Sequence, residues 1–219
     1  MATKIPLAVR LKKESHRKIA AAQDLIVREV YALFRRPVLH GGTAIWRCYV
    51  GRRFSEDLDF YIPKESEKIA AVFVALEKVG FKVLKKKVSE NSVYSELAFD
   101  RITVRFEATF QHIQGTLCDY ENVDGTFISI FSLTPESFIK EKIAAYLKRK
   151  KIRDLYDLYF LTNFVTDPYS LVRDFQEFFR SYEKPVDEQD LRILILEGTI
   201  PTSEELLEYL KRKWLRKNT

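Results

Sequence analysis

Apolar side chains recur at three- and four-residue steps in two N-terminal segments of the chain. Residues 14–34 predict an amphipathic helix, whose apolar side is formed by Ile19, Ala22, Ile26, Val30 and Leu33. Residues 65–79 repeat the spacing and predict a second helix, with a stop at Gly80. Between these helices, "DLDFYI" (57–62) alternates with a period of two, which predicts a strand with one polar face and one core face.

The middle of the chain is typical of a sheet. Residues 81–88, 92–99 and 102–110 predict three strands in an antiparallel meander, because turn-forming residues lie in or near the short connections between them. Residues 125–132 predict a further strand.

From Thr134 onward the pattern becomes helical. Thr134 at an N-cap and Pro135 at the first helical position predict a helix over 134–149. Further helices are predicted at about residues 153–165, 168–181, 187–197 and 203–216. We therefore expect an α+β fold, with an α/β core over residues 1–132 and an all-helical region over residues 133–219.

The composition is that of a globular protein with a basic bias. The 219 residues carry a net charge of +6 and a pI near 9.1, which favours a polyanionic partner but also suits a basic surface kept for solubility. Two cysteines without CxxC spacing and three scattered histidines argue against a zinc site. The N-terminus is too charged for a signal peptide, and no apolar run approaches ~20 residues, so we expect a cytoplasmic protein with no membrane partner.

Two acids in the predicted strand pose an electrostatic problem. In a strand, Asp57 and Asp59 lie on one face, about 6.6 Å apart at ~3.3 Å per residue. Carboxylates this close resist joint ionisation unless a cation bridges them, and Mg²⁺ does this while leaving sites for phosphate oxygens. The structural alternative is an exposed pair balanced by Arg52 or Arg53.

A glycine-rich turn lies about fifteen residues upstream of the acids. Gly41 and Gly42 let the backbone approach a ligand closely, and Thr43 adds a hydroxyl at the start of a short helix, an arrangement that favours phosphate. Alone, the segment is equally a plain turn with a threonine cap. Together with the paired acids, it suggests phosphoryl or nucleotidyl transfer.

Two blocks of sequence carry a family resemblance. "GGTAI…RFSEDLDF" and "TPESFIKEKIAAYLKRKKIRDLYDLYFL" resemble, in order and spacing, the signatures of the AbiEii-type nucleotidyltransferase toxins. That family belongs to the DNA polymerase β-like nucleotidyltransferase superfamily. The resemblance implies a polymerase β-like core with a mixed sheet, whose active-site cleft is completed by the helical C-terminal region.

The resemblance assigns roles to the first block. Gly41, Gly42 and Thr43 match the phosphate-holding turn, and Ser55 matches a serine placed near the nucleotide phosphates. Asp57 and Asp59 match the metal-binding acids. Superfamily members commonly carry a third acid on a later strand, and Glu107 is the candidate, because it shares a strand face with Thr103 and Arg105. Either Glu107 completes the metal site, or phosphates and water do, with Arg105 neutralising the glutamate.

The second block supplies the remaining roles. Lys142 matches a triphosphate-binding lysine, Arg149 a basic residue later on the helix, Asp154 the proposed catalytic base and Asp157 its partner. From spacing alone, Lys142 and Arg149 share a helix face, and Asp157 can pair locally with Arg153 or Asp154. The alternative is a solvated polar helix face.

The resemblance implies Mg²⁺- or Mn²⁺-dependent transfer of a nucleotide from an NTP to RNA, at the 3′ end of tRNA, by a toxin with a cognate antitoxin. Basic clusters at residues 85–87, 148–151 and 211–217 support an RNA acceptor, and the last includes Trp214, which could stack on a base. The alternatives are transfer to a protein hydroxyl, a kinase-like phosphotransferase, and a non-catalytic nucleotide- or RNA-binding module. Two interpretations of Arg52 and Arg53 remain open: they contact the acceptor, or they balance the charge of Asp57 and Asp59 when the metal is absent.

Overall fold

The computed structural model describes residues 5–215. The chain divides into two compact units. The first comprises Met1–Val50 and Phe54–Ser132, and the second comprises Gly51–Arg53 and Leu133–Thr219. Gly51–Arg53 therefore belong to the C-terminal unit although they lie within the N-terminal part of the sequence. The sequence pattern does not indicate this.

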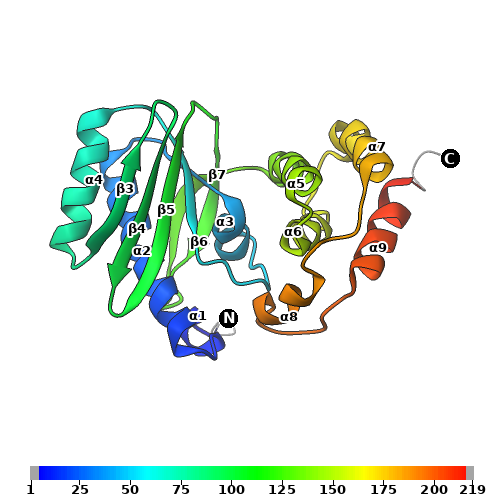
Figure 1. Cartoon of the computed structure of the whole chain (residues 1–219), viewed down its shortest axis with the longest axis horizontal. Helices are drawn as coiled ribbons and strands as arrows, with labels where there is room; N and C mark the ends of the chain where they lie inside the picture. The colour runs from blue at the N-terminus through cyan, green and yellow to red at the C-terminus, as the bar shows by residue number, and fades with distance from the viewer. Residues whose placement is uncertain (1–4, 216–219) are drawn as a thin grey trace. The chain divides into compact units, whose positions relative to one another are not determined.

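The first unit is built on a mixed sheet of seven strands in the order β3-β4-β5-β2-β1-β7-β6 (Figure 1). The pairs β1–β7 and β2–β5 are parallel, and the other neighbours are antiparallel. The strands are β1 (Val38–His40), β2 (Leu58–Ile62), β3 (Lys82–Val88), β4 (Ser92–Phe99), β5 (Ile102–Phe110), β6 (Thr116–Glu121) and β7 (Phe127–Ser132).

Two helices cover the apolar face of this sheet. Phe60 and Phe106 meet on that face, where Tyr31 of α2 and Phe73 of α4 pack against them. A short helix, α3, starts directly at the end of β1 and contacts β1, β2 and β6. The helices of the unit are α1 (Leu7–Arg10), α2 (Glu14–Leu33), α3 (Gly41–Cys48) and α4 (Ser66–Lys78).

The alternation predicted for residues 57–62 is present in β2, but the strand begins at Leu58, so Asp57 lies just before it. Leu58, Phe60 and Ile62 are buried, whereas Asp59 and Tyr61 are half-buried on the opposite face. Because strand side chains alternate, the acidic positions face away from α2 and α4. The hydrophobic pattern therefore fixes which face of the sheet carries the polar chemistry.

The second unit is helical. Thr134 caps its first helix as predicted, since the backbone N–H of Ser137 donates to the Thr134 hydroxyl at 3.2 Å and Pro135 occupies the first turn. Aromatic packing among Tyr146, Phe178 and Trp214 fills the interior together with Phe175. The elements are α5 (Pro135–Arg149), α6 (Ile152–Leu161), η1 (Pro168–Leu171), α7 (Val172–Ser181), η2 (Glu188–Asp190), α8 (Leu191–Leu194) and α9 (Ser203–Leu215).

The predicted α+β fold class is confirmed, with differences in detail. Strand β6 was not predicted, and the helix expected over 187–197 is only a 3-10 turn followed by the four residues of α8. The predicted end of the last helix, residue 216, lies outside the described residues. Within residues 5–215, no helix is long and apolar enough to cross a membrane.

Candidate active site

Two acids lie side by side on the polar face of the sheet. Asp59 of β2 is the direct partner of Glu107 of β5 in the parallel pair, so their side chains project from the same face. Burial and the neighbouring charge of Asp59 raise the pKa of Glu107 above its ordinary value. The sequence predicts repulsion between Asp57 and Asp59, whereas the structure shows it at Glu107, where the charge of Asp59 acts more strongly than that of Asp57.

Asp57 precedes β2 and is neutralised by an arginine of β5. Arg105 Nε donates to Asp57 Oδ1 at 2.7 Å, and Arg105 Nη2 bonds to Asp57 Oδ2. Arg105 therefore balances Asp57, and its positive charge also opposes the rise in the pKa of Glu107. Within residues 5–215, no three metal-ligating side chains are grouped closely enough to hold an ion by themselves.

Gly41 begins α3 directly against the acids. Its φ of +73° is disfavoured for any residue with a side chain, and a Cβ there would lie 2.2 Å from Asp59 Oδ2. Gly41 and Gly42 form the first turn of the helix rather than a separate turn before it. The first N–H groups of a helix have no partner within the helix, so these backbone donors start beside the Asp59 carboxylate.

Thr43 does not offer its hydroxyl to a ligand. The side chain is fully buried, and its Oγ1 donates to the backbone carbonyl of Asp57. The predicted contact between this hydroxyl and a phosphate is therefore wrong. Thr43 instead ties the start of α3 to the loop that carries Ser55 and Asp57. Ser55 itself is half-buried, and its carbonyl is one of the acceptors inside this loop.

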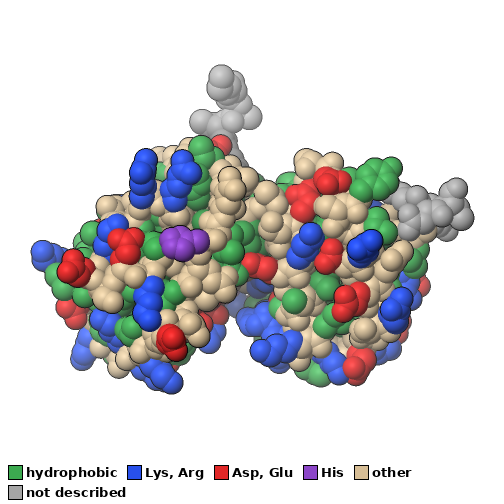
Figure 2. Space-filling model, turned by 90° about the horizontal axis from the view of Figure 1, so that it is seen from above, with side chains coloured by type: hydrophobic (Ala, Val, Ile, Leu, Met, Phe, Trp, Pro, Cys, Tyr) green, Lys and Arg blue, Asp and Glu red, His purple; other side chains and the backbone are tan. Residues whose placement is uncertain are grey.

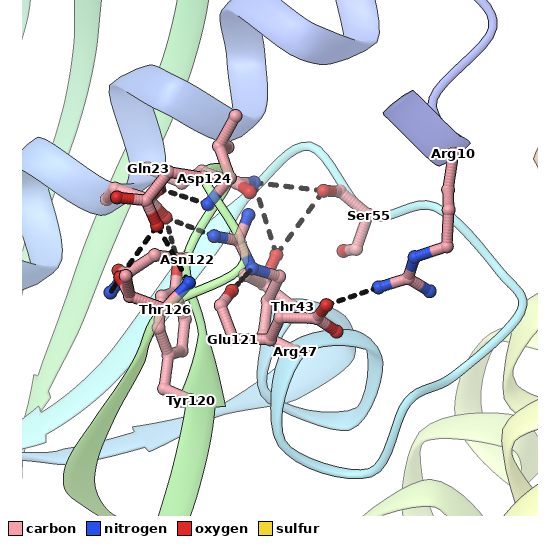
Figure 3. A network of polar contacts seen from close by, with 12 residues as sticks. Arg10, Gln23, Thr43, Arg47, Ser55, Tyr120, Glu121, Asn122, Asp124 and Thr126 are labelled. Carbon is pink, nitrogen blue, oxygen red and sulfur yellow. Dashed lines mark hydrogen bonds and ion pairs between the residues drawn. The ribbon is translucent and has the colours of Figure 1, made fainter. Parts of the chain in front are cut away.

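Gln23 of α2 holds the same loop and was not predicted. Its Nε2 donates to the Ser55 carbonyl at 2.9 Å (Figure 3) and to the Glu56 carbonyl at 3.0 Å. The side chain has no exposed surface. A signal was present in the sequence, since Gln23 follows Ala22 on the otherwise apolar side of the predicted helix, where a buried amide needs partners.

The far end of α3 is fixed by a second buried network, also shown in Figure 3. Arg47 pairs with Asp24 of α2, and its Nε donates to the carbonyl of Glu121 at 2.7 Å. Asp24 Oδ1 also accepts the Tyr120 hydroxyl at 3.0 Å. Burial raises the pKa of Asp24, while the charge of Arg47 opposes that shift. This network sets the direction of α3 and hence where its first turn lies relative to Asp59.

The second unit contains a buried group of charged side chains. Asp157 accepts from Arg53 at both oxygens, from Nε and Nη2 at 2.8 Å each, and pairs with Lys142 Nζ at 2.7 Å. Burial alone would raise the pKa of Asp157, but the charges of Arg53 and Lys142 outweigh it and lower the pKa. The segment 51–53 is held in this unit because Leu196 N–H donates to the Arg52 carbonyl at 2.8 Å.

Asp154 lies one helical turn before Asp157 on α6. Both of its oxygens accept from Arg149, from Nε and Nη2 at 2.7 Å each, and Lys142 Nζ lies 3.4 Å from Oδ1. Lys142 therefore bridges the two aspartates. The structure thus brings together four of the residues predicted in the second block, Lys142, Arg149, Asp154 and Asp157, and adds Arg53.

Arg153 is not part of this group. The local pair predicted between Arg153 and Asp157 is wrong, because Asp157 is held by Arg53 and Lys142. Arg153 instead lines a separate cavity of about 420 Å³ with Lys151, Asp187, Asp190, Ile193 and Leu194.

The predicted basic clusters are less uniform than their sequences indicate. Strand alternation divides residues 85–87, so that Lys85 lies over the Tyr94 ring and Lys86 over Phe73 of α4. Figure 2 shows Lys and Arg interspersed with Asp and Glu on the visible face of each unit. Trp214 is buried and stacked on Phe175 with centroids 4.2 Å apart, so its predicted role in base stacking is wrong. Arg216 and Lys217 of the last cluster lie outside the described residues.

A family comparison identifies the chain. The family model described as the nucleotidyl transferase AbiEii toxin of a type IV toxin–antitoxin system matches residues 25–215. This protein belongs to the AbiEii family. Its members are nucleotidyltransferase toxins of type IV toxin–antitoxin systems, so the predicted enzyme class and the resemblance of the two sequence blocks are confirmed.

Solved structures share the AbiEii fold seen here. MenT4, a nucleotidyltransferase toxin from Mycobacterium tuberculosis, has a TM-score of 0.59 at 18% identity, with 99% of this chain and 91% of that chain covered. JHP933 from Helicobacter pylori has a TM-score of 0.58 at 20% identity, with 90% of this chain and 94% of that chain covered. Comparison with curated protein sequences gave no match.

Proposed function

We propose that this AbiEii-family protein uses Mg²⁺ or Mn²⁺ to transfer an NMP from an NTP to RNA, at the 3′ end of tRNA. Its toxic effect is then a block of translation that a cognate antitoxin relieves. The reaction belongs in the cytoplasm, where NTPs and tRNA are found.

The arrangement of Asp59, Glu107 and Gly41 carries the proposal. Two carboxylates project in register from neighbouring strands, and the first backbone N–H groups of a helix begin beside them. Hard divalent ions take carboxylate oxygens and keep positions for phosphate, while helix N-termini favour phosphate. The raised pKa of Glu107 indicates a crowded acidic position that a cation would relieve.

The donors fit a metal that shares its coordination with the substrate. Asp59 and Glu107 would hold it, and Asp57 would join them after releasing Arg105. Phosphate oxygens and water would fill the remaining positions, because the protein offers too few ligands for a complete shell in the described residues. When bound, such an ion neutralises charge on the transferring phosphoryl group.

The chain's own residues supply the other functions of the proposal. Gly41 and Gly42 offer backbone N–H donors to phosphate, and Gln23 and Thr43 fix the loop that carries Asp57. Lys142 and Arg149 supply positive charge that attracts phosphate oxygens. An RNA acceptor is supported by the net charge of +6, whereas the buried Trp214 gives it no support.

The test is a transfer assay with the purified full-length protein. Each NTP, labelled at the α-phosphate, is incubated with Mg²⁺ and total RNA, and the products are separated on a gel. Label on tRNA-sized RNA that is lost after removal of the 3′ terminal nucleotide supports the proposal. Asp59→Asn should abolish transfer, while Asp119→Asn, at an exposed acid of β6 in the same sheet, should not.

Other outcomes would replace the proposal with one of its alternatives. Label that comes only from the γ-phosphate indicates phosphotransfer, and label on a protein band indicates a protein hydroxyl as acceptor. Absence of label with retained NTP or RNA binding indicates a non-catalytic binding module.

A further inference from the structure

The carboxylates of the two buried aspartates of α6 form ion pairs with basic side chains. Asp154 has no exposed surface, and both of its oxygens accept from Arg149, with Lys142 near one of them. Asp157 is 1% exposed, and both of its oxygens are taken by Arg53, with Lys142 bonded to one of them. Three cations and two anions thus form one group with a net charge of +1, in which all members except Arg149 are buried.

A general base needs a different environment. It must reach the proton of the acceptor hydroxyl within hydrogen-bond distance, directly or through one water. Asp154 would have to give up two parallel bonds to Arg149 at 2.7 Å each to do so. Such charge-assisted pairs are strong, so breaking both of them to reach an acceptor hydroxyl would be costly.

Of the three cations, Arg149 alone is substantially exposed to solvent. The Arg149 side chain is 42% exposed although its Nε and Nη2 are bonded to Asp154. Lys142 is 8% exposed and is held between two carboxylates. Asp154 and Asp157 therefore fix the direction of both positive side chains, and Arg149 keeps an exposed surface that can meet a phosphate.

We propose that Asp154 and Asp157 are positioning residues rather than general bases, and that Arg53 is a third positioning residue that acts through Asp157. They hold Lys142 and Arg149 in the arrangement that binds the triphosphate. This inference rests on the proposed function, because it assigns the phosphate-binding role to those two cations. The role proposed for Arg53 differs from both interpretations of the sequence, which were contact with the acceptor substrate and neutralisation of Asp57 and Asp59.

A measurement of nucleotide binding in the absence of transfer distinguishes a positioning residue from a general base. The probe is the α,β-methylene analogue of each common NTP with Mg²⁺, titrated calorimetrically into the full-length protein. Asp154→Asn keeps the shape of the side chain and removes its charge. Positioning predicts affinity weakened by roughly tenfold or more, the equivalent of one lost charge-assisted hydrogen bond. Wild-type affinity in Asp154→Asn combined with lost transfer would identify a general base and overturn the inference.

Steady-state kinetics give a second distinction. Positioning predicts that the KM for the NTP rises in Asp154→Asn and that the pH–rate profile keeps its wild-type shape. Loss of the acidic limb of that profile would contradict the inference. Lys184→Gln removes an exposed ion pair with Glu204 in the same unit and should leave KM and affinity unchanged.

Arg53→Lys keeps the test decisive if Asp154→Asn does not fold. Lysine retains the buried charge but cannot make two parallel bonds to Asp157. Weakened analogue binding by protein that is folded at the assay temperature supports the inference. A lowered melting temperature with unchanged affinity indicates a merely structural arginine and overturns it for Arg53. If the wild-type protein binds no analogue, the proposed function itself fails.

Discussion

The hydroxyl of Thr43 offers a sharp test of how the acidic loop is held. Thr43→Val keeps the size and branching of the side chain but removes Oγ1. Of the three contacts of that atom, the bond to the Asp57 carbonyl is short, while Ser55 O and Gln23 Nε2 lie at 3.4 Å and contribute little. The substitution therefore deprives mainly one buried carbonyl of this donor.

The magnitude follows from burial. Losing one side-chain hydrogen bond costs about 0.5–1.5 kcal/mol, toward the upper end here because Thr43 has no exposed surface. Thr43→Ser keeps the hydroxyl and loses a buried methyl, which costs about 1 kcal/mol. Urea midpoints should therefore fall by similar amounts in both variants, so stability alone does not distinguish them.

The transfer rate separates the two variants. In Thr43→Val the loop 55–57 loses its tie to α3, and a displacement of Asp57 by about 1 Å can slow the reaction on the order of a hundredfold. Thr43→Ser should keep a rate close to wild type. Equal rates in the two variants would refute the positioning role. Normal stability of Thr43→Val with weakened NTP binding would restore the hydroxyl as a phosphate ligand.

Three further predictions concern the remaining contacts. Gln23→Leu leaves two part-buried carbonyls without this donor, so we expect stability to fall by about 1–3 kcal/mol in urea unfolding, with slower transfer. Arg105→Gln removes the ion pair that neutralises Asp57, so Mn²⁺, followed by its EPR signal, should bind several-fold more tightly, roughly 1 kcal/mol. The pKa of Asp157 is lowered by its cationic partners, which outweigh burial, so its charge stabilises the fold at neutral pH, and that stabilisation disappears as pH falls through the lowered pKa. The stability gap between wild type and Asp157→Asn should then be largest near neutral pH and shrink below about pH 4.

Each of these predictions has a contradicting result. Wild-type stability in Gln23→Leu would mean that the loop carbonyls find other donors. Unchanged or weaker Mn²⁺ binding in Arg105→Gln would show that Arg105 does not compete with the metal. A stability gap for Asp157→Asn that grows toward acid pH would have the opposite sign from the lowered pKa.

The sequence predicts those parts of the fold that depend on local periodicity. The helix over residues 14–34 and the strand with Asp59 follow from apolar spacing, and both are present. The cap at Thr134 follows from side-chain chemistry within one turn. Strand β6 was missed because "TLCDYE" has mixed character and is stabilised by pairing with β7, a tertiary effect.

The site was predictable as a set of residue types but not as a set of contacts. The pairing of Asp59 with Glu107 depends on the register of two strands that are far apart in sequence. The ion pair between Arg53 and Asp157 connects residues that are 104 positions apart in the sequence, and it forms because residues 51–53 belong to the helical unit. Local spacing instead favoured Arg153 as the partner of Asp157, and the longer-range bidentate pair prevailed.

Transfer of label from an α-labelled NTP to RNA by wild type, Asp59→Asn and Asp119→Asn in one assay tests the central claim most directly. We expect label on tRNA with wild type and Asp119→Asn and none with Asp59→Asn, while all three proteins melt cooperatively. Transfer by Asp59→Asn at the wild-type rate would contradict the assignment of the acid pair, and absence of label with all three would contradict nucleotidyl transfer to RNA.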